Sequence, residues 1–206
     1  MIQKEDILSP TRQDALKEIF NIGSGNAATT LSEAIRQKVL VSVPQIKVST
    51  PEEALAALVK PNLPVVCMIN VFAGDIAGCT LWMMPGDSAK EFAEECWHKM
   101  PRSRNEGEFH FGQIHREISS VLTESYLNAL GDMLELSAIP SPPEMVSGPM
   151  RAVLGRVLNN HTREGCPLAY VQNRFRFLGG AKTFSGYFMM LPDRASLDNI
   201  LSHLGV

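Results

Sequence analysis

The chain has 206 residues, a hydrophobic fraction of 45% and a formal net charge of −3 at pH 7. This length and composition allow a substantial core, and the weakly acidic charge excludes the basic surface that nucleic-acid binding requires. The N-terminus lacks the pattern of a signal peptide, and the longest apolar stretch, 63–73, is interrupted by Asn70 and is too short to cross a bilayer. We therefore expect a cytoplasmic protein without membrane insertion.

The first half of the chain is predicted to start with a long helix and to end with a β-hairpin and a further helix. Ser9 and Pro10 suit the N-cap and first helical position, and Gly74 begins the hairpin turn. In chain order, the apolar periodicity predicts a helix over 10–37, a strand near 40–50, a short helix over 51–59, strands at about 65–73 and 76–84, and a helix over 87–99.

The second half is predicted to repeat this order after a linker at 101–107. Its predicted elements are a long helix over about 108–136, an extended proline-rich segment at 137–143, a helix at about 147–160, strands near 167–177 and 182–191, and a final helix at 194–204. Long helices over an antiparallel sheet predict an α+β fold with two pseudo-symmetric halves, about 10–100 and 107–206. We expect one domain over 1–206 with a shared sheet, because so few strands are marginal alone.

Polar residues recur at one spacing in the two long helices. The first set stands at i, i+4 and i+7, followed by a proline 23 positions later, and comprises Asp14, Glu18, Asn21 and Pro44. Each member of the second set lies 99 positions further on, and this set comprises Gln113, Glu117, Ser120 and Pro143. Because a helix advances about 100° per residue, the helical positions of each set share one face. One copy alone would fit an ordinary solvated face, whereas the repeat favours a functional site.

These residues resemble the CheC/CheX/FliY family of bacterial chemotaxis phosphatases, and most closely CheC. The family signature is Asp or Ser, three residues, Glu, two residues, Asn, twenty-two residues and Pro, and the first set matches it at every position. Segments 16–28, 125–130 and 140–143 also look like CheC. The second set departs from the signature, because Gln113 replaces Asp or Ser and Ser120 replaces Asn. The resemblance therefore implies one intact site and one degenerate site.

The resemblance implies a hydrolase that removes the phosphate of a phosphorylated response regulator such as CheY. Asn21 would orient the attacking water, and Glu18 would pair with the invariant lysine of the receiver domain. Pro44 would fix the entry of the following strand, and Asp14 would act through local charge unless it is an ordinary surface acid. Mg²⁺ would belong to the response regulator, so the chain would need no metal or cofactor of its own.

Two other functions are open at this point. The chain could be an adaptor that binds and regulates the receptor deamidase CheD, with contacts at the helix near 147–160. It could also be a structural relative of the flagellar switch proteins, although the presence of both Glu18 and Asn21 argues against this. Gly23 and Gly25 would allow another backbone to approach, and the partner helix of the fold is favoured over a docked receiver for that role.

The cysteines and histidines give no support to metal or nucleophilic chemistry. No CxxC pair and no histidine pair at i, i+4 occurs, and no histidine stands at zinc spacing from a cysteine. Among Cys67, Cys79, Cys96 and Cys166, the first two lie in apolar strand-like segments and are expected to be small buried hydrophobes.

Overall fold

The computed structural model describes residues 10–42, 46–58, 62–99, 109–161, 168–178 and 182–204. The elements of the first half are α2 (Pro10–Ile35), β1 (Val39–Ser42), β2 (Ile46–Ser49), α3 (Pro51–Leu58), β3 (Pro64–Gly74), β4 (Gly78–Pro85) and α4 (Gly86–Lys99). Those of the second half are α5 (Phe111–Leu134), β5 (Ala138–Pro140), β6 (Glu144–Pro149), α6 (Met150–His161), β7 (Leu168–Phe177), β8 (Thr183–Pro192) and α7 (Arg194–His203). The same order occurs twice, which confirms an α+β fold with two pseudo-symmetric halves.

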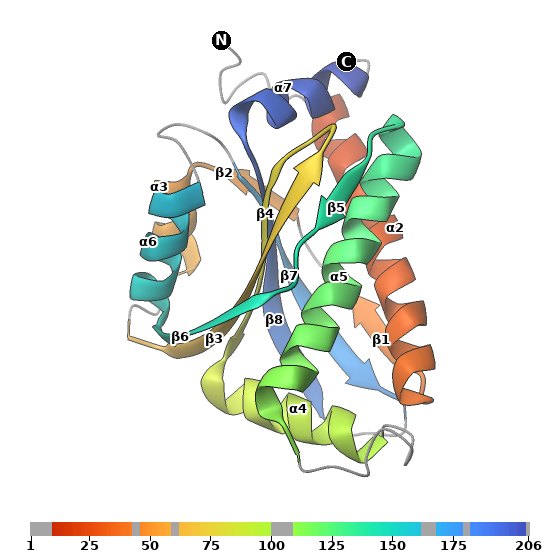
Figure 1. The fold of residues 1–206 in the computed structure, drawn as a ribbon, viewed down its shortest axis with the longest axis vertical. Helices are drawn as coiled ribbons and strands as arrows, with labels where there is room; N and C mark the ends of the chain where they lie inside the picture. The colour runs from red at the N-terminus through yellow and green to blue at the C-terminus, as the bar shows by residue number, and fades with distance from the viewer. Residues whose placement is uncertain are drawn as a thin grey trace.

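One antiparallel sheet runs through the middle of the molecule (Figure 1). Its strand order is β1-β7-β8-β4-β3-β5, with β2 also paired to β7 and β6 also paired to β3. The hairpins of the two halves meet at the centre, where Leu81 of β4 lies opposite Met189 of β8. The short strands of each half therefore pair with the hairpin of the other half.

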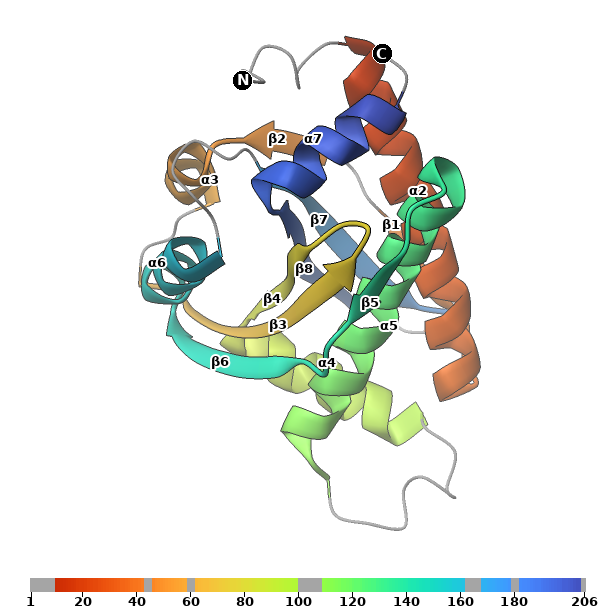
Figure 2. The same cartoon turned by 45° about the horizontal axis from the view of Figure 1, so that its top comes forward.

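Helices cover both faces of this sheet. Figures 1 and 2 show α2 and α5 side by side on one face and α3 beside α6 on the other, with α4 and α7 at opposite ends. The larger core cluster lies on the side of α2, α4 and α5, and its largest side chains include Phe20, Trp82, Phe92, Tyr126 and Phe188. A second cluster lies between the sheet and the pair formed by α3 and α6. The face of α2 that points away from the larger cluster is left to solvent.

The structure corrects three of the predicted boundaries. The single strand expected near 40–50 consists of two strands, β1 and β2, and residues 43–45 between them lie outside the described part. Strand β6 was not predicted, and α6 accordingly begins at Met150 rather than near 147. The physical reason is that 144–149 pairs with β3 along its length, a long-range contact that overrides local preference. Ser9 and the linker at 101–107 lie outside the described residues.

Within the described ranges, no helix combines the length and the apolar character needed to cross a bilayer.

Candidate functional site

Helix α2 places the first set of polar residues on its solvent side. Its buried side, which includes Ile19 and Phe20, packs into the larger core cluster. The residues at i, i+4 and i+7 on the other side are all exposed, namely Asp14, Glu18 and Asn21. The structure thus brings these three side chains to one exposed stripe, as helical spacing predicts.

The Glu18 carboxylate and the Asn21 carboxamide are exposed, and no described side chain bonds to either of them. The main-chain carbonyl of Asn21 accepts a hydrogen bond from Ser24 Oγ at 2.9 Å. Its side-chain carboxamide has no hydrogen-bond partner among the described residues. Glu18 has no ion-pair partner among the described residues. A free carboxamide can accept a hydrogen bond with its oxygen and donate with its NH₂ at the same time. The pair is therefore available to a molecule that docks on α2.

Asp14 differs from these two residues because it has a partner on its own helix. Lys17 Nζ donates to Asp14 Oδ1 at 2.6 Å, one turn along α2. Both side chains are exposed, so the pair contributes less than about 1 kcal/mol to stability and can open when a partner docks. Pro44, the fourth residue of the set, lies outside the described residues.

Gly23 lies where α2 packs closely against Tyr126 of α5. A Cβ at this position would overlap Tyr126 Cδ1 and would lie 3.0 Å from Tyr126 Cα. Tyr126 is itself held in place, since its ring stacks on Phe188 with centroids 4.3 Å apart and its hydroxyl accepts from Asn173 Nδ2 at 2.8 Å. The expected role in helix packing is confirmed for Gly23. It is wrong for Gly25, where a Cβ would meet nothing within 4 Å.

Helix α5 carries an equivalent stripe with different chemistry. Gln113 is exposed, and Glu117 and Ser120 are partly exposed. Gln113 Nε2 donates to Glu117 Oε1 at 3.2 Å, so this carboxylate is engaged within its own helix. The Ser120 hydroxyl is shorter than a carboxamide and lacks its paired acceptor and donor. The second stripe therefore keeps the position of the first but not its free acid and amide.

The ends of α2 and α5 show that the 99-residue offset is structural. Arg36 and Glu135, which are separated by this offset, both have positive φ angles, 53° and 57°. The residue after each of them donates its N–H to the carbonyl five positions earlier, at 3.1 Å in the first helix and 3.3 Å in the second. The two helices end in the same way, which places Asn21 and Ser120 at equivalent positions.

A buried hydrogen-bond network holds the segment before Pro143, which immediately precedes β6. Asn70 of β3 donates from Nδ2 to Ser141 O at 3.1 Å. Its Oδ1 accepts from Ser119 Oγ at 2.7 Å and from Thr123 Oγ1 at 3.2 Å, so β3, α5 and the segment 141–143 are linked. Sequence reasoning treated Asn70 only as an interruption. A polar residue inside an apolar strand is the signal for such a network, because a buried amide requires partners.

The described cysteines do not form a nucleophilic site. Cys67, Cys79 and Cys96 are buried, which confirms the expectation for the first two, and Cys166 lies outside the described residues. Burial raises the pKa of the Cys79 and Cys96 thiols to about 12, and it raises the pKa of Cys67 as well. Since the thiolate is the reactive form, these three side chains are inert near neutral pH. No group of three or more His, Cys, Asp or Glu side chains in the described ranges is arranged to hold a metal ion.

Known proteins match this chain in sequence and in fold. A sequence model of the CheC-like family matches residues 12–48, which contain the first set of polar residues. The chain is 26% identical over 197 residues to the CheY-P phosphatase CheC of Bacillus subtilis (strain 168), with 94% of each protein covered. The crystal structure of Thermotoga maritima FliY matches with a TM-score of 0.73 at 16% identity, over 97% of this chain and 98% of the FliY chain. The FliM middle domain from H. pylori matches with a TM-score of 0.58 at 14% identity, over 98% and 99%. At these identities, the two structures show the fold alone.

Proposed function

Because the chain belongs to the CheC-like family, we propose that it is a phosphatase that hydrolyses the aspartyl phosphate of a CheY-like response regulator. The observation that supports this most directly is the exposed pair of Glu18 and Asn21 on α2, which no described side chain engages. The B. subtilis relative is named for the same activity, and its alignment spans nearly the whole chain.

Asn21 is proposed to position the attacking water. In this step the water oxygen attacks phosphorus in line with the aspartyl oxygen, and the bond between phosphorus and that oxygen breaks. The products are a free aspartate carboxylate, inorganic phosphate and a proton. The Asn21 carboxamide oxygen accepts a hydrogen bond from the water, and its NH₂ donates to a neighbouring oxygen. Because an acyl phosphate is labile, positioning is the main requirement, and no group of this chain becomes covalently bound.

Glu18 is proposed to anchor the partner. Its carboxylate stands one turn before Asn21 on the same stripe, so both side chains meet a docked protein together. A lysine of the receiver domain beside the phosphorylated aspartate is the cation that Glu18 would bind. This ion pair would draw the lysine away from the phosphoryl group, and docking would exclude water and strengthen the attraction. Asp14 would support the stripe through its charge, and Pro44 through the path of the chain after β1.

The metal ion of the reaction is proposed to come with the substrate. Mg²⁺ binds carboxylates and phosphoryl oxygens, and the acidic pocket of a response regulator offers both. This chain would then contribute no cofactor, and we place the reaction in the cytoplasm with its partner.

The second stripe is proposed to be inactive or nearly so. Ser120 cannot reproduce the two hydrogen bonds of a carboxamide, and Glu117 is engaged by Gln113 at 3.2 Å. The activity of the chain would therefore come from α2.

Two matched alanine variants test this proposal. Asn21→Ala is expected to lower accelerated phosphate release roughly a hundredfold or more, because one well-placed polar group contributes that much in such sites. Ser120→Ala, at the equivalent position of α5, is expected to leave the rate nearly unchanged. The measurement is phosphate release from a purified phosphorylated response regulator, corrected for its own decay. Full activity of Asn21→Ala, or an equal loss in both variants, would show that the assigned mechanism is wrong.

A further inference from the structure

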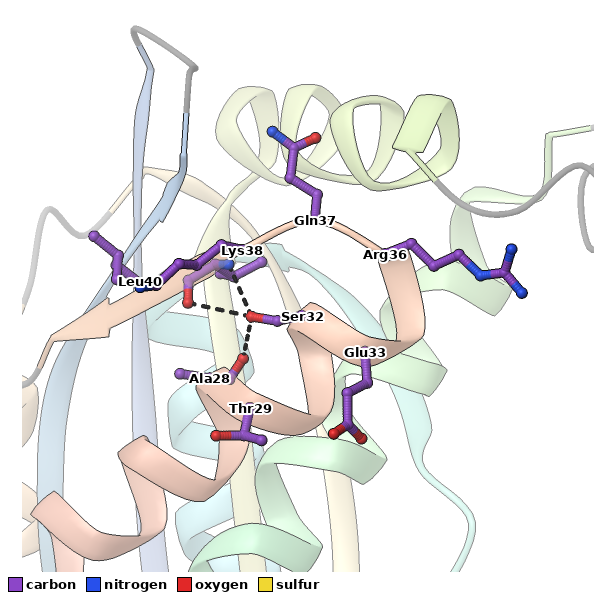
Figure 3. Close-up of a pocket in the computed structure, with 9 residues that line it drawn as sticks. Ala28, Thr29, Ser32, Glu33, Arg36, Gln37, Lys38 and Leu40 are labelled. Carbon is purple, nitrogen blue, oxygen red and sulfur yellow. Dashed lines mark hydrogen bonds between the residues drawn. The ribbon is translucent and has the colours of Figure 1, made fainter.

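A hollow with a volume of about 480 Å³ opens where α2 ends and β1 begins (Figure 3). Ala28, Thr29 and Ser32 line it from the last turns of the helix, and Leu40 lines it from the strand. The lining is mainly apolar. The hollow is open to solvent, and its volume is large enough to accommodate a bulky side chain of another molecule.

The hollow continues the stripe that carries Glu18 and Asn21. At 100° per residue, positions 21, 25, 29 and 32 all lie within about 60° of Glu18 around the axis of α2. Gly25 stands between Asn21 and the hollow, and a Cβ there would meet nothing within 4 Å. Between Asn21 and the hollow, this face carries Gly25, which has no side chain, and Ile22, an exposed apolar residue that would also contact a docked protein. At 1.5 Å per residue, Thr29 lies about 12 Å along the helix from Asn21.

A protein docked over Asn21 would cover the hollow as well. A standard protein interface buries about 800 Å² of each partner, which corresponds to a round patch of about 16 Å radius. A smaller transient contact of about 600 Å² would still extend to about 14 Å. Thr29 falls inside both limits, so the hollow lies under the edge of a partner centred on the proposed catalytic residue.

The free edge of β1 at the hollow is closed to an added β-strand. The Val39 N–H donates to Ser32 Oγ at 2.8 Å, and Ser32 Oγ in turn donates to Ala28 O at 2.5 Å. Figure 3 shows this hydroxyl at the meeting point of the helix and the strand. Because Ser32 occupies the main-chain group that a further strand would need, strand addition at Val39 is disfavoured. The space beside it suits a side chain better than a main chain.

The charges along this face of α2 change sign between the stripe and the hollow. Glu18 supplies an exposed acid at one end. At the other end, Arg36 and Lys38 are exposed cations at the hollow, next to the single acid Glu33. A partner with a cation opposite Glu18 and an acid opposite Lys38 would be complementary in one orientation only.

We propose that the hollow is a second docking point for the phosphorylated response regulator, and that it takes an apolar side chain of that protein that lies next to an acidic residue. This inference rests on the proposed phosphatase function, because it concerns the same partner on the same face. The contact at the hollow would add to the affinity with which the response regulator docks over Asn21.

A pair of tyrosine variants tests the docking point. Thr29→Tyr places a ring in the hollow, whereas Thr30→Tyr is the matched control, since Thr30 is also exposed on α2 but does not line the hollow. With the phosphorylated response regulator as substrate, Thr29→Tyr is expected to raise KM about tenfold or more and to leave kcat within about twofold, because docking is lost and the chemistry is not. Thr30→Tyr should leave both constants unchanged.

A charge variant and a direct binding measurement complete the test. Lys38→Glu is expected to raise KM as well, and the effect should shrink at high salt, where surface charges are screened. Binding of the response regulator to each variant is measured in parallel, with thermal unfolding midpoints to show that all variants fold.

The outcomes separate this inference from the proposed function. If Thr29→Tyr binds the response regulator as tightly as the wild type does, the hollow is not a docking point, and the phosphatase proposal is unaffected. If the wild type releases no extra phosphate while Thr29→Tyr still weakens binding, the docking point stands and the phosphatase proposal fails. A wild-type chain that does not bind the response regulator would overturn both.

Discussion

Asn21 and Ser120 occupy equivalent positions on α2 and α5, so their side chains give a comparison within one molecule. The carboxamide of Asn21 is exposed and free of described partners, whereas Ser120 offers a partly exposed hydroxyl. Their acidic neighbours also differ, because Glu117 accepts from Gln113 while Glu18 has no described ion-pair partner. The chemistry proposed for this chain depends on these differences of single residues and not on the backbone.

We predict that substitutions on α5 can restore phosphatase activity at the second stripe. In an Asn21→Ala background, Ser120→Asn supplies the missing amide, and Gln113→Asp removes the hydrogen bond that engages Glu117. We expect this triple variant to recover phosphate release to within about tenfold of the wild type, because the helix already holds the positions in place. The control is Asn21→Ala with Gln113→Asp alone, which should stay inactive. If the triple variant is also inactive, the difference between the stripes lies beyond these residues.

At the element scale, the packing of α2 on α5 predicts opposite effects for two neighbouring glycines. Gly23→Ala would force a methyl group against the side chain and Cα of Tyr126, and overpacking of this kind typically costs 1–3 kcal/mol, here about 1 kcal/mol or more. Gly25→Ala meets no atom within 4 Å and should raise the free energy of unfolding by about 0.5–1 kcal/mol, because alanine favours a helix. Urea unfolding of both variants measures this. If both substitutions changed the free energy of unfolding in the same direction, the close packing of α2 on α5 at Gly23 would be contradicted.

The elements also show how far the sequence alone predicts this fold. Apolar periodicity predicted both long helices and both hairpins, because each is set by contacts within a short stretch of chain. Strand β6 was missed, since Ser147, Gly148 and Pro149 have poor strand preference and the strand exists through its pairing with β3. The division of 40–50 into β1 and β2 was missed as well, and both of these strands pair with β7, more than a hundred residues later.

Some features of the candidate site follow from the local sequence, and others depend on contacts between segments that are far apart in the chain. Exposure of Glu18 and Asn21 follows from helical spacing, which the sequence displays directly. The network around Asn70 joins β3 to α5, and the hollow joins the end of α2 to β1. A polar residue inside an apolar strand could have indicated that Asn70 has buried partners, but the partners themselves and the hollow depend on the relative placement of separate elements, which no local pattern in the sequence specifies.

In the whole molecule, strands of each half pair with strands of the other half in one shared sheet. Strands β1 and β2 pair with β7 of the second half, and β5 and β6 pair with β3 of the first. Either half alone would retain a hairpin without the strands that flank it, and such small sheets are marginal in water. We therefore propose that residues 1–206 fold as a single domain.

The stability of the whole molecule is predicted to depend on the protonation of His115. This ring is buried beside Phe92 and Phe111, and its Nε2 donates to Ala89 O at 3.0 Å. Burial lowers the pKa of His115 below its ordinary value of 6.5. The unfolded chain therefore takes up a proton at higher pH than the folded chain does, so the free energy of unfolding falls as pH drops below about 6.5.

Unfolding measured between pH 5 and 7 checks this dependence on His115. His115→Gln should flatten the change of stability with pH, because the group that titrates is gone. His110→Gln is the control, since His110 is exposed and its replacement should leave the dependence intact. Equal pH dependence of the wild type and His115→Gln would rule out His115 as its source.

We propose that the Asn21 carboxamide on α2 makes this chain an enzyme toward phosphorylated response regulators. The most direct test of this proposal is the number of phosphates that each molecule releases when the phosphorylated response regulator is in large excess. We expect many turnovers for the wild type, whereas Asn21→Ala should release phosphate no faster than spontaneous decay although the response regulator still binds. A wild-type chain that releases at most one phosphate per molecule, or an Asn21→Ala chain that turns over as fast as the wild type, would contradict it.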